Sequence, residues 1–129
     1  MSDLDYLPVT VIGGYLGAGK TTLVNYLLRN ANGLRLAVLV NEFGELAIDK
    51  DLIETEEDGL ISISGGCVCC SFGGDLITAL QNLSKMQPRP QHILIESSGV
   101  AKPSAIFDSV TLLNGFAADG VVVLADAET

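Results

Sequence analysis

One glycine-rich segment constrains the fold of this chain more than any other feature. Residues 14–21, GYLGAGKT, fit the pattern G-x-x-x-x-G-K-[ST] of a phosphate-binding P-loop. A β-branched apolar run precedes the segment and apolar residues at helical spacing follow it: Val9, Val11 and Ile12, then Leu23, Val24, Leu27 and Leu28. A strand, a glycine loop and a helix in this order form the context that the motif requires. The sequence therefore predicts a nucleoside triphosphate site, and the alternative is a glycine-rich turn that binds nothing.

The chemistry of such a loop assigns a role to each of its residues. Glycines let the backbone approach a phosphate, and N–H groups at a helix N-terminus point at the anion. The Lys20 ammonium reaches the β- and γ-phosphates, and the Thr21 hydroxyl binds Mg²⁺. The predicted nucleotide-binding residues are Gly14, Gly17, Ala18, Gly19, Lys20, Thr21, Thr22 and, at the end of a later strand, Gly99.

Short apolar runs alternate with helical patterns along the rest of the chain. Strands are expected around 9–12, 36–40, 60–64, 93–95 and 121–124, and helices around 20–28, 76–83 and 103–113. This alternation predicts an α/β fold of the P-loop NTPase kind, a mostly parallel sheet with helices on both faces in a Rossmann-like, three-layer arrangement. The 129 residues are expected to form one domain.

Composition and charge exclude several classes of protein. Hydrophobic residues make up 48% of the chain and aromatic residues only 5%, which favours an aliphatic interior. A net charge of −9 argues against a nucleic-acid partner. There is no apolar stretch long enough to span a membrane and no basic N-terminal start, so we expect a cytoplasmic protein. The acidic segment Glu54–Asp58 is expected to be a solvated, mobile loop.

Polar residues follow several of the predicted strands, at the edge where open α/β sheets bind their ligands. Segment 41–49 follows one strand, and Glu96 to Gly99 follow another. A carboxylate at the position of Glu96 holds Mg²⁺ in nucleotide sites, and the alternative is a capping or surface glutamate. The predicted catalytic residues are Lys20, Glu96 and Asp49, with Glu42 as a further candidate for positioning the attacking water.

The three cysteines of the chain are Cys67, Cys69 and Cys70, and they are expected in a loop that leaves a strand. Three thiolates suit a soft or borderline ion such as Zn²⁺, Cu⁺ or Co²⁺ with a fourth position open. Glu42 or Glu45 would complete such a site. The alternatives are buried structural cysteines or a redox pair. The single histidine, His92, is expected to have a packing or surface role rather than to bind a metal.

Four motifs in one order resemble the CobW-like family of P-loop GTPases, which is related to the GTPases that insert nickel into urease and hydrogenase. Residues 14–22 resemble the family's GxxGxGKTT, 41–49 its NEFGEIGID, 66–70 its GCxCC and 96–99 its ExxG. The resemblance implies a metal-regulated GTPase that uses GTP and Mg²⁺, binds Zn²⁺ or Co²⁺, and transfers the metal to a client metalloprotein. The metal-binding residues that it implies are Cys67, Cys69, Cys70, Thr21, Glu42 and Glu96.

The chain also departs from the family pattern. Ala47 replaces a glycine, Ser97-Ser98 stands where two threonines are common, and the guanine-reading NKxD motif is absent. The missing NKxD motif, together with the missing C-terminal domain of the family, favours an N-terminal portion of a longer GTPase, in which a preference for guanine over adenine depends on residues elsewhere. The exposed edge of the final strand would allow a dimer. Two alternatives stay open: a nucleotide-gated metal-binding module without effective hydrolysis, and a generic P-loop kinase or ATPase.

Overall fold

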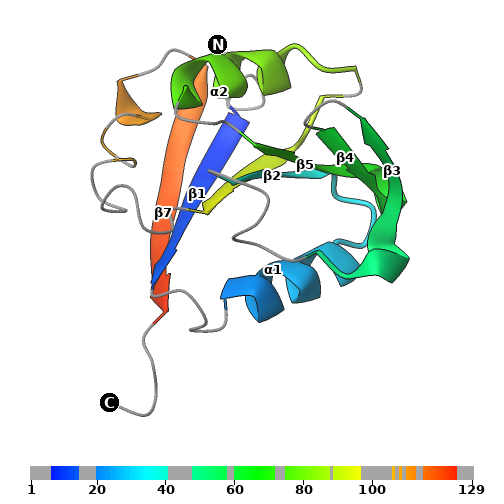
Figure 1. The fold of residues 1–129 in the computed structure, drawn as a ribbon. Coiled ribbons are helices and arrows are strands. Elements are labelled where there is room, and N and C mark those ends of the chain that lie inside the picture. The colour runs from blue at the N-terminus through cyan, green and yellow to red at the C-terminus, as the bar shows by residue number, and fades with distance from the viewer. Residues whose placement is uncertain are drawn as a thin grey trace.

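The fold is built on one seven-stranded sheet in the order β3-β4-β5-β2-β6-β1-β7 (Figure 1). The computed structural model describes residues 7–14, 20–40, 48–57, 60–71, 75–87, 89–96, 106, 108, 110–112 and 115–124. The strands are β1 (Leu7–Gly14), β2 (Leu36–Val40), β3 (Ile53–Glu57), β4 (Leu60–Ile63), β5 (Cys67–Ser71), β6 (His92–Glu96) and β7 (Phe116–Leu124). The helices are α1 (Lys20–Arg29) and α2 (Leu76–Ser84), with short 3-10 turns η3 (Lys50–Leu52) and η4 (Ser64–Gly66).

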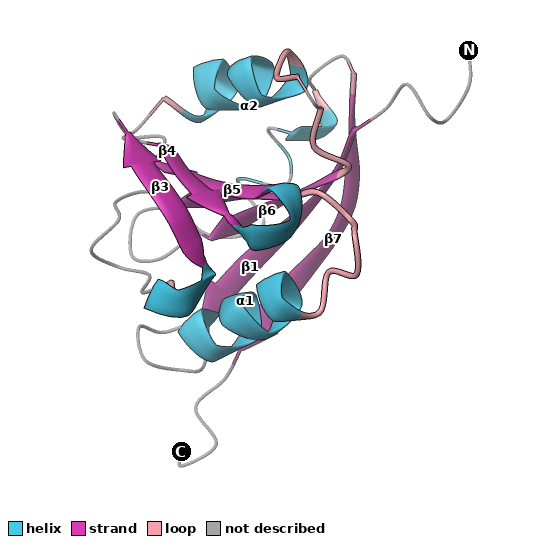
Figure 2. Cartoon of the chain, turned by 90° about the vertical axis from the view of Figure 1, so that its right-hand side faces the viewer, coloured by secondary structure: helices cyan, strands magenta, loops and turns pink. Residues whose placement is uncertain are grey.

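The five strands from β5 to β7 run parallel, whereas β3 and β4 form an antiparallel hairpin that joins β5. The prediction of a mostly parallel sheet is therefore confirmed. Figure 2 shows α1 and α2 on opposite sides of this sheet, as expected for an α/β fold with helices on both faces. No helix in the described part of the chain is long and apolar enough to span a membrane.

Two aliphatic clusters fill the space between the sheet and its helices. The cluster under α2 is formed by Leu7, Val9, Val11, Ala37, Leu39, Leu80, Leu83, Ile93, Ile95, Ile106, Val110 and Phe116. The cluster over α1 is formed by Ile12, Val24, Leu28, Leu36, Val38, Val40, Leu52, Ile63, Cys67, Cys69 and Leu94. Alternate residues of β2 and β6 fall into different clusters, because successive side chains of a strand point to opposite faces. Strands buried on both faces have apolar residues at nearly every position, as the sequence predicted.

Local sequence explains where the two helices begin and end. The Asp75 side chain caps α2 by accepting a hydrogen bond from the Thr78 N–H at 3.1 Å. After α1, Asn32 and Gly33 adopt positive φ angles of 54° and 89°, a conformation that asparagine and glycine tolerate and that ends the helix in a turn. The helical conformation at residues 106, 108, 110 and 111 agrees with the predicted third helix, whose residues Pro103, Phe107 and Leu113 lie outside the described part.

Two predictions about the middle of the chain are wrong. Residues 67–70 are not a loop, because they form most of β5 and pair with β2 on one side and β4 on the other. The acidic segment is not a mobile loop either, since Ile53–Glu57 form the edge strand β3. Exposed carboxylates on an edge strand discourage pairing with another chain, which explains acidic residues in a strand. At the other edge, the last strand is longer than expected and pairs with β1.

Candidate functional site

The carboxyl ends of three neighbouring strands meet at one edge of the sheet. Glu96, the last residue of β6, is in register with Ile12 of β1 on one side and Val40 of β2 on the other. The P-loop follows β1, segment 41–47 follows β2, and segment 97–99 follows β6. The predicted convergence of these strand ends is therefore confirmed. The residues that follow them, including Gly17, Ala18, Gly19, Glu42, Glu45 and Gly99, lie outside the described part.

The P-loop spans the interval between a strand and a helix, as the motif requires. Gly14 is the last residue of β1, and Lys20 is the first residue of α1. Lys20, Thr21 and Thr22 therefore belong to the first turn of α1, where free N–H groups and the helix dipole favour an anion. This geometry fits the predicted phosphate-binding roles of these residues.

Glu96 is the most deeply buried charged residue of the described part, with 1% of its surface exposed. A carboxylate in this position costs free energy unless a hydrogen-bond donor or a cation compensates its charge. Carboxylate and hydroxyl oxygens are the hard ligands that Mg²⁺ prefers. Glu96 at the end of β6 and Thr21 in the first turn of α1 therefore fit a magnesium site at the same edge.

The three cysteines lie in β5 and do not share one face of the sheet. Cys67 and Cys69 are 1% exposed and belong to the cluster over α1, whereas Cys70 packs against the cluster under α2. The Cys67 sulfur accepts a hydrogen bond from the Leu36 N–H at 3.4 Å and donates one to the Leu34 carbonyl at 3.5 Å. Cys67 therefore connects β5 to the start of β2. This end of β5 lies away from the edge where β1, β2 and β6 end, which is called the nucleotide edge below.

Cys70 lies closer to the nucleotide edge. It is in register with Leu39 of β2, and the next residue, Ser71, is in register with Val40. Only β2 separates β5 from β6, so the backbones that carry Cys70 and Glu96 are about 10 Å apart at the spacing of hydrogen-bonded strands. A ligand at the nucleotide edge and a ligand at Cys70 would be near neighbours.

Burial favours the protonated form of the Cys69 and Cys70 thiols. It raises the pKa of Cys69 to about 12, with a smaller contribution from the charge of Cys70, and it raises the pKa of Cys70 to about 11. Zinc binds the thiolate, so zinc binding here has to displace protons. The described residues contain no group of three or more His, Cys, Asp or Glu side chains that already surround a metal position. Joint coordination by all three cysteines stays a prediction, and it requires part of β5 to leave its pairing.

His92 packs as the sequence predicted. Its Nε2 atom shares a hydrogen bond with the Thr10 hydroxyl at 2.8 Å, across β6 and β1. Both residues line a cavity of about 330 Å³ between the end of α1 and the sheet, together with Leu27, Asn30, Ala31, Leu34, Leu36 and Leu94. Leu36 and His92 begin their strands, so this cavity lies at the end of the sheet opposite to the nucleotide edge.

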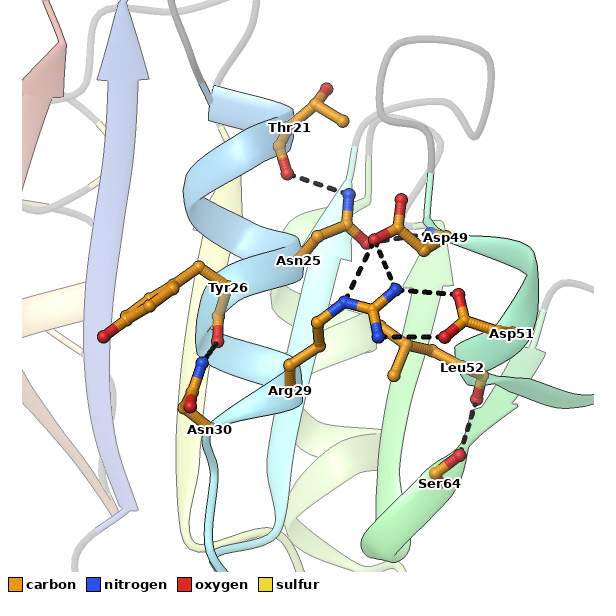
Figure 3. Close-up of polar contacts among 9 residues, drawn as sticks. All are labelled: Thr21, Asn25, Tyr26, Arg29, Asn30, Asp49, Asp51, Leu52 and Ser64. Atoms are coloured by element: carbon orange, nitrogen blue, oxygen red, sulfur yellow. Dashed lines mark hydrogen bonds and ion pairs between the residues drawn. The ribbon is translucent and has the colours of Figure 1, made fainter.

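One polar network near the site was missed by the sequence reasoning. The Asp49 carboxylate, predicted to be catalytic, bonds the Arg29 guanidinium at 2.9 Å, and Arg29 also bonds Asp51 (Figure 3). Asn25, one helical turn before Arg29, accepts a hydrogen bond from the Asp49 N–H at 2.8 Å. The only sequence signal for this network is that the polar residues Thr21, Asn25 and Arg29 are four positions apart, which places all three on one face of α1.

The chain is similar to proteins of known families. The profile of "CobW/HypB/UreG, nucleotide-binding domain" matches residues 8–129. The chain is 40% identical over 130 residues to "Zinc chaperone CobW" of Sinorhizobium sp, covering 94% of the chain and 37% of that protein. It is 38% identical over 118 residues to "Zinc-regulated GTPase metalloprotein activator 1" of Dictyostelium discoideum, covering 81% of the chain and 25% of that protein.

A solved structure shares the fold. The crystal structure of the Zn(II)-bound YjiA GTPase from E. coli superposes with a TM-score of 0.66 at 30% sequence identity, over 92% of this chain and 40% of that one. The chain thus spans well under half the length of the proteins that it matches. The residues matched by the family profile, 8–129, include both helices and the positions of all four motifs.

Proposed function

Because this chain belongs to the family of CobW/HypB/UreG nucleotide-binding domains, we propose that it binds and hydrolyses GTP and uses the nucleotide to control a bound zinc ion. The relatives are named zinc chaperone and zinc-regulated GTPase, which supports this function for the protein to which the chain belongs. The observation that supports the proposal is the register of β1, β2 and β6, in which the buried Glu96 lies level with the ends of the two strands that precede the P-loop and segment 41–47 in the sequence.

Different residues at this edge bind the phosphates, the magnesium ion and the attacking water. The first turn of α1 binds the phosphates through its N–H groups, and Lys20 adds a positive charge where negative charge develops on the transferred phosphoryl group. Thr21 and Glu96 hold Mg²⁺, which when bound neutralises charge on the phosphates. In this structure the Asp49 carboxylate is bound by Arg29, so we favour Glu42 or Glu96 over Asp49 for orienting the attacking water.

Zinc is bound by the thiolates of β5 and then passed to a client metalloprotein. Cys69 and Cys70 lie at the end of β5 near the nucleotide edge, which brings cargo and nucleotide close together. Co²⁺ would fit the same donors. Cys69 is buried and Cys70 is partly buried, so loss of β5 pairing near Cys70 would expose these thiols to an incoming ion. We place this transfer in the cytoplasm.

GTP turnover with and without zinc tests this function. We expect zinc to change kcat/KM for GTP, and we expect replacement of all three cysteines by serine to abolish the zinc response. A generic P-loop kinase would instead transfer phosphate to a substrate other than water, and its turnover would ignore the cysteines. Turnover that is independent of zinc in the native protein would contradict the proposal.

A further inference from the structure

Asn25 connects the nucleotide-binding helix to the segment that follows residue 47. Its Nδ2 group donates a hydrogen bond to the Thr21 carbonyl at 2.9 Å, one turn back along α1. Its Oδ1 atom accepts from the Asp49 N–H at 2.8 Å (Figure 3). One amide group therefore bonds both the backbone of the predicted magnesium ligand and the backbone at the end of segment 41–49.

Arg29 makes a second connection one turn further along the same helix. Its guanidinium binds the Asp49 carboxylate through Nε and NH2, at 3.3 and 2.9 Å. The same group binds the Asp51 carboxylate through NH1 and NH2, at 2.9 and 2.7 Å. These hydrogen bonds, first those to Asp51, raise the pKa of Arg29 above its ordinary value, and Arg29 in turn lowers the pKa of Asp51. The planar guanidinium fork fixes two carboxylates at once, so it sets the direction in which the chain enters η3.

A third connection joins η3 to the cysteine strand. Leu52, the last residue of η3, is buried in the cluster over α1, and its carbonyl accepts a hydrogen bond from the Ser64 hydroxyl at 3.1 Å. Ser64 begins the turn in which Gly65 and Gly66 adopt φ angles of 83° and 91°, and Cys67 follows directly. Hydrogen bonds and short turns thus form a continuous path from Thr21 to β5.

We propose that Asn25 and Arg29 are positioning residues that hold residues 48–52 against the nucleotide-binding helix, and that this contact couples the nucleotide state at Thr21 to zinc affinity at β5. The inference rests on the proposed function, since it needs a nucleotide at one end and a metal at the other. It assigns the coupling to two side chains of α1 that none of the four family motifs contains.

Stability alone does not account for these residues. Asn25 is 6% exposed, and the cost of burying its amide offsets much of what its hydrogen bonds to Thr21 and Asp49 contribute to folding. The Arg29 ion pairs are half-exposed, at 43% for the arginine, and exposed ion pairs contribute little to folding free energy. Both side chains are better explained by the position that they impose on residues 48–52.

The test measures zinc affinity of the protein with and without GTP and Mg²⁺, and compares the ratio of the two dissociation constants among variants. In Asn25→Ala we expect this ratio to move toward one by about 5-fold or more, the lower end of allosteric coupling. Zinc affinity without nucleotide and GTP affinity are expected to stay within about 2-fold, because neither ligand touches the Asn25 side chain. In Arg29→Gln the ratio moves in the same direction by less, because Asn25 still bonds Asp49.

The chain offers a matched control. Asn30 directly follows the last residue of α1 and donates a hydrogen bond to the Tyr26 carbonyl at 2.8 Å, the same bond to the carbonyl four residues back that Asn25 makes to Thr21. Among the described contacts Asn30 makes none with residues 48–52. Asn30→Ala should therefore keep the native ratio, although it removes an asparagine that makes the same kind of bond to α1.

The outcomes separate this inference from the function on which it rests. A ratio of one in the native protein overturns the proposed function and this inference with it. A native ratio that departs from one and survives in both Asn25→Ala and Arg29→Gln overturns the inference alone. If Asn25→Ala proves unfolded by its circular dichroism, Arg29→Gln decides, because its half-exposed side chain can be replaced without opening a cavity.

Discussion

The parallel strands of the sheet and the β3–β4 hairpin at its edge differ in how completely they are buried. In the parallel part all five residues of β2 are buried, and β6 is buried from Ile93 to Glu96. In the hairpin, β3 is exposed at four of its five positions and β4 is half-buried at three of four. β5 stands at the boundary, parallel to β2 and antiparallel to β4.

This difference assigns different mechanical properties to the two parts. Strands with few buried contacts open at lower free energy than core strands. The predicted nucleotide residues follow strands of the well-buried part, which provides a fixed platform for phosphate chemistry. The cysteines lie on β5, between the fully buried strand β2 and the half-buried strand β4. We therefore expect the pairing of β5 with β4 to open more easily than its pairing with β2, which leaves the parallel strands in place.

The largest expected effect is on the free energy of unfolding, when one apolar residue of the parallel strands is compared with one of the hairpin. Leu39 of β2 is fully buried, and Leu39→Ala should lower the free energy of unfolding by about 2–5 kcal/mol through lost burial and a cavity. Ile61 of β4 is only partly buried, so Ile61→Ala should cost about 1 kcal/mol. Urea unfolding followed by circular dichroism measures both. Equal losses would show that the hairpin is as firm as the parallel part.

Zinc affinity should respond to the boundary strand and not to the hairpin beside it. We expect Cys69→Ser and Cys70→Ser each to weaken zinc binding by more than roughly 100-fold. Substitution of a residue that only hydrogen-bonds a metal ligand costs roughly 10–100-fold, and loss of a ligand should cost more. Ser62→Ala in β4 is the control, because Ser62 is in register with Val68 of β5 and carries no thiol. Competition with a chromophoric chelator measures these affinities. Native affinity in both cysteine variants would mean that the thiols are structural.

The acidic edge should keep the hairpin from pairing with a second chain. Exposed Glu54 and Glu56 lie on β3, and charged residues on an edge strand oppose association. Glu54→Val with Glu56→Val should therefore convert part of the protein to dimers or larger species in sedimentation velocity runs. The same pair of changes to glutamine, which keeps size and polarity, should associate less. A monomeric valine variant would show that the charges do not protect this edge.

The smallest effect concerns the ion pairs that join the hairpin side to α1. Hydrogen bonds from Arg29 lower the pKa of Asp51 below its ordinary value of 3.8. The stabilisation from this pair is therefore fully present above about pH 4, and it is lost as pH falls through the lowered pKa. An NMR titration of the Asp51 carboxyl carbon should give a midpoint below 3.8, and Arg29→Gln should raise it. An unchanged midpoint in that variant would mean that the pair does not persist in solution.

Local pattern predicted the buried part of the fold well, and it failed at the boundary. The run Leu36–Val40 was predicted as a strand with the bounds that the structure gives, because branched apolar residues at every position suit a strand covered on both faces. Residues 67–70 were predicted as a loop, since two glycines precede them and cysteines suggested a binding loop. Pairing with β2 and β4 determines their conformation. The partners on β2 lie about 30 positions away in the sequence, and the partners on β4 belong to the β3–β4 hairpin.

The candidate site was predictable only where a motif marks it. The P-loop and Glu96 were found from residues that are neighbours in sequence, and the strand register brings them to one edge. The network of Asn25, Arg29 and Asp49 joins residues 20 to 24 positions apart, and no local pattern specifies such a distance. The division of the cysteines between two faces was likewise invisible until β5 was known to be a strand.

The most direct test of nucleotide-controlled metal binding is a Co²⁺ titration of the reduced protein, with and without GTP and Mg²⁺, followed by thiolate-to-cobalt charge-transfer absorbance. We predict that the charge-transfer band appears, which reports bonds from the β5 thiolates to the metal, and that its midpoint shifts when nucleotide is present. Absence of the band, or a midpoint that is the same with and without nucleotide, would contradict coupling between the P-loop edge and the cysteine strand.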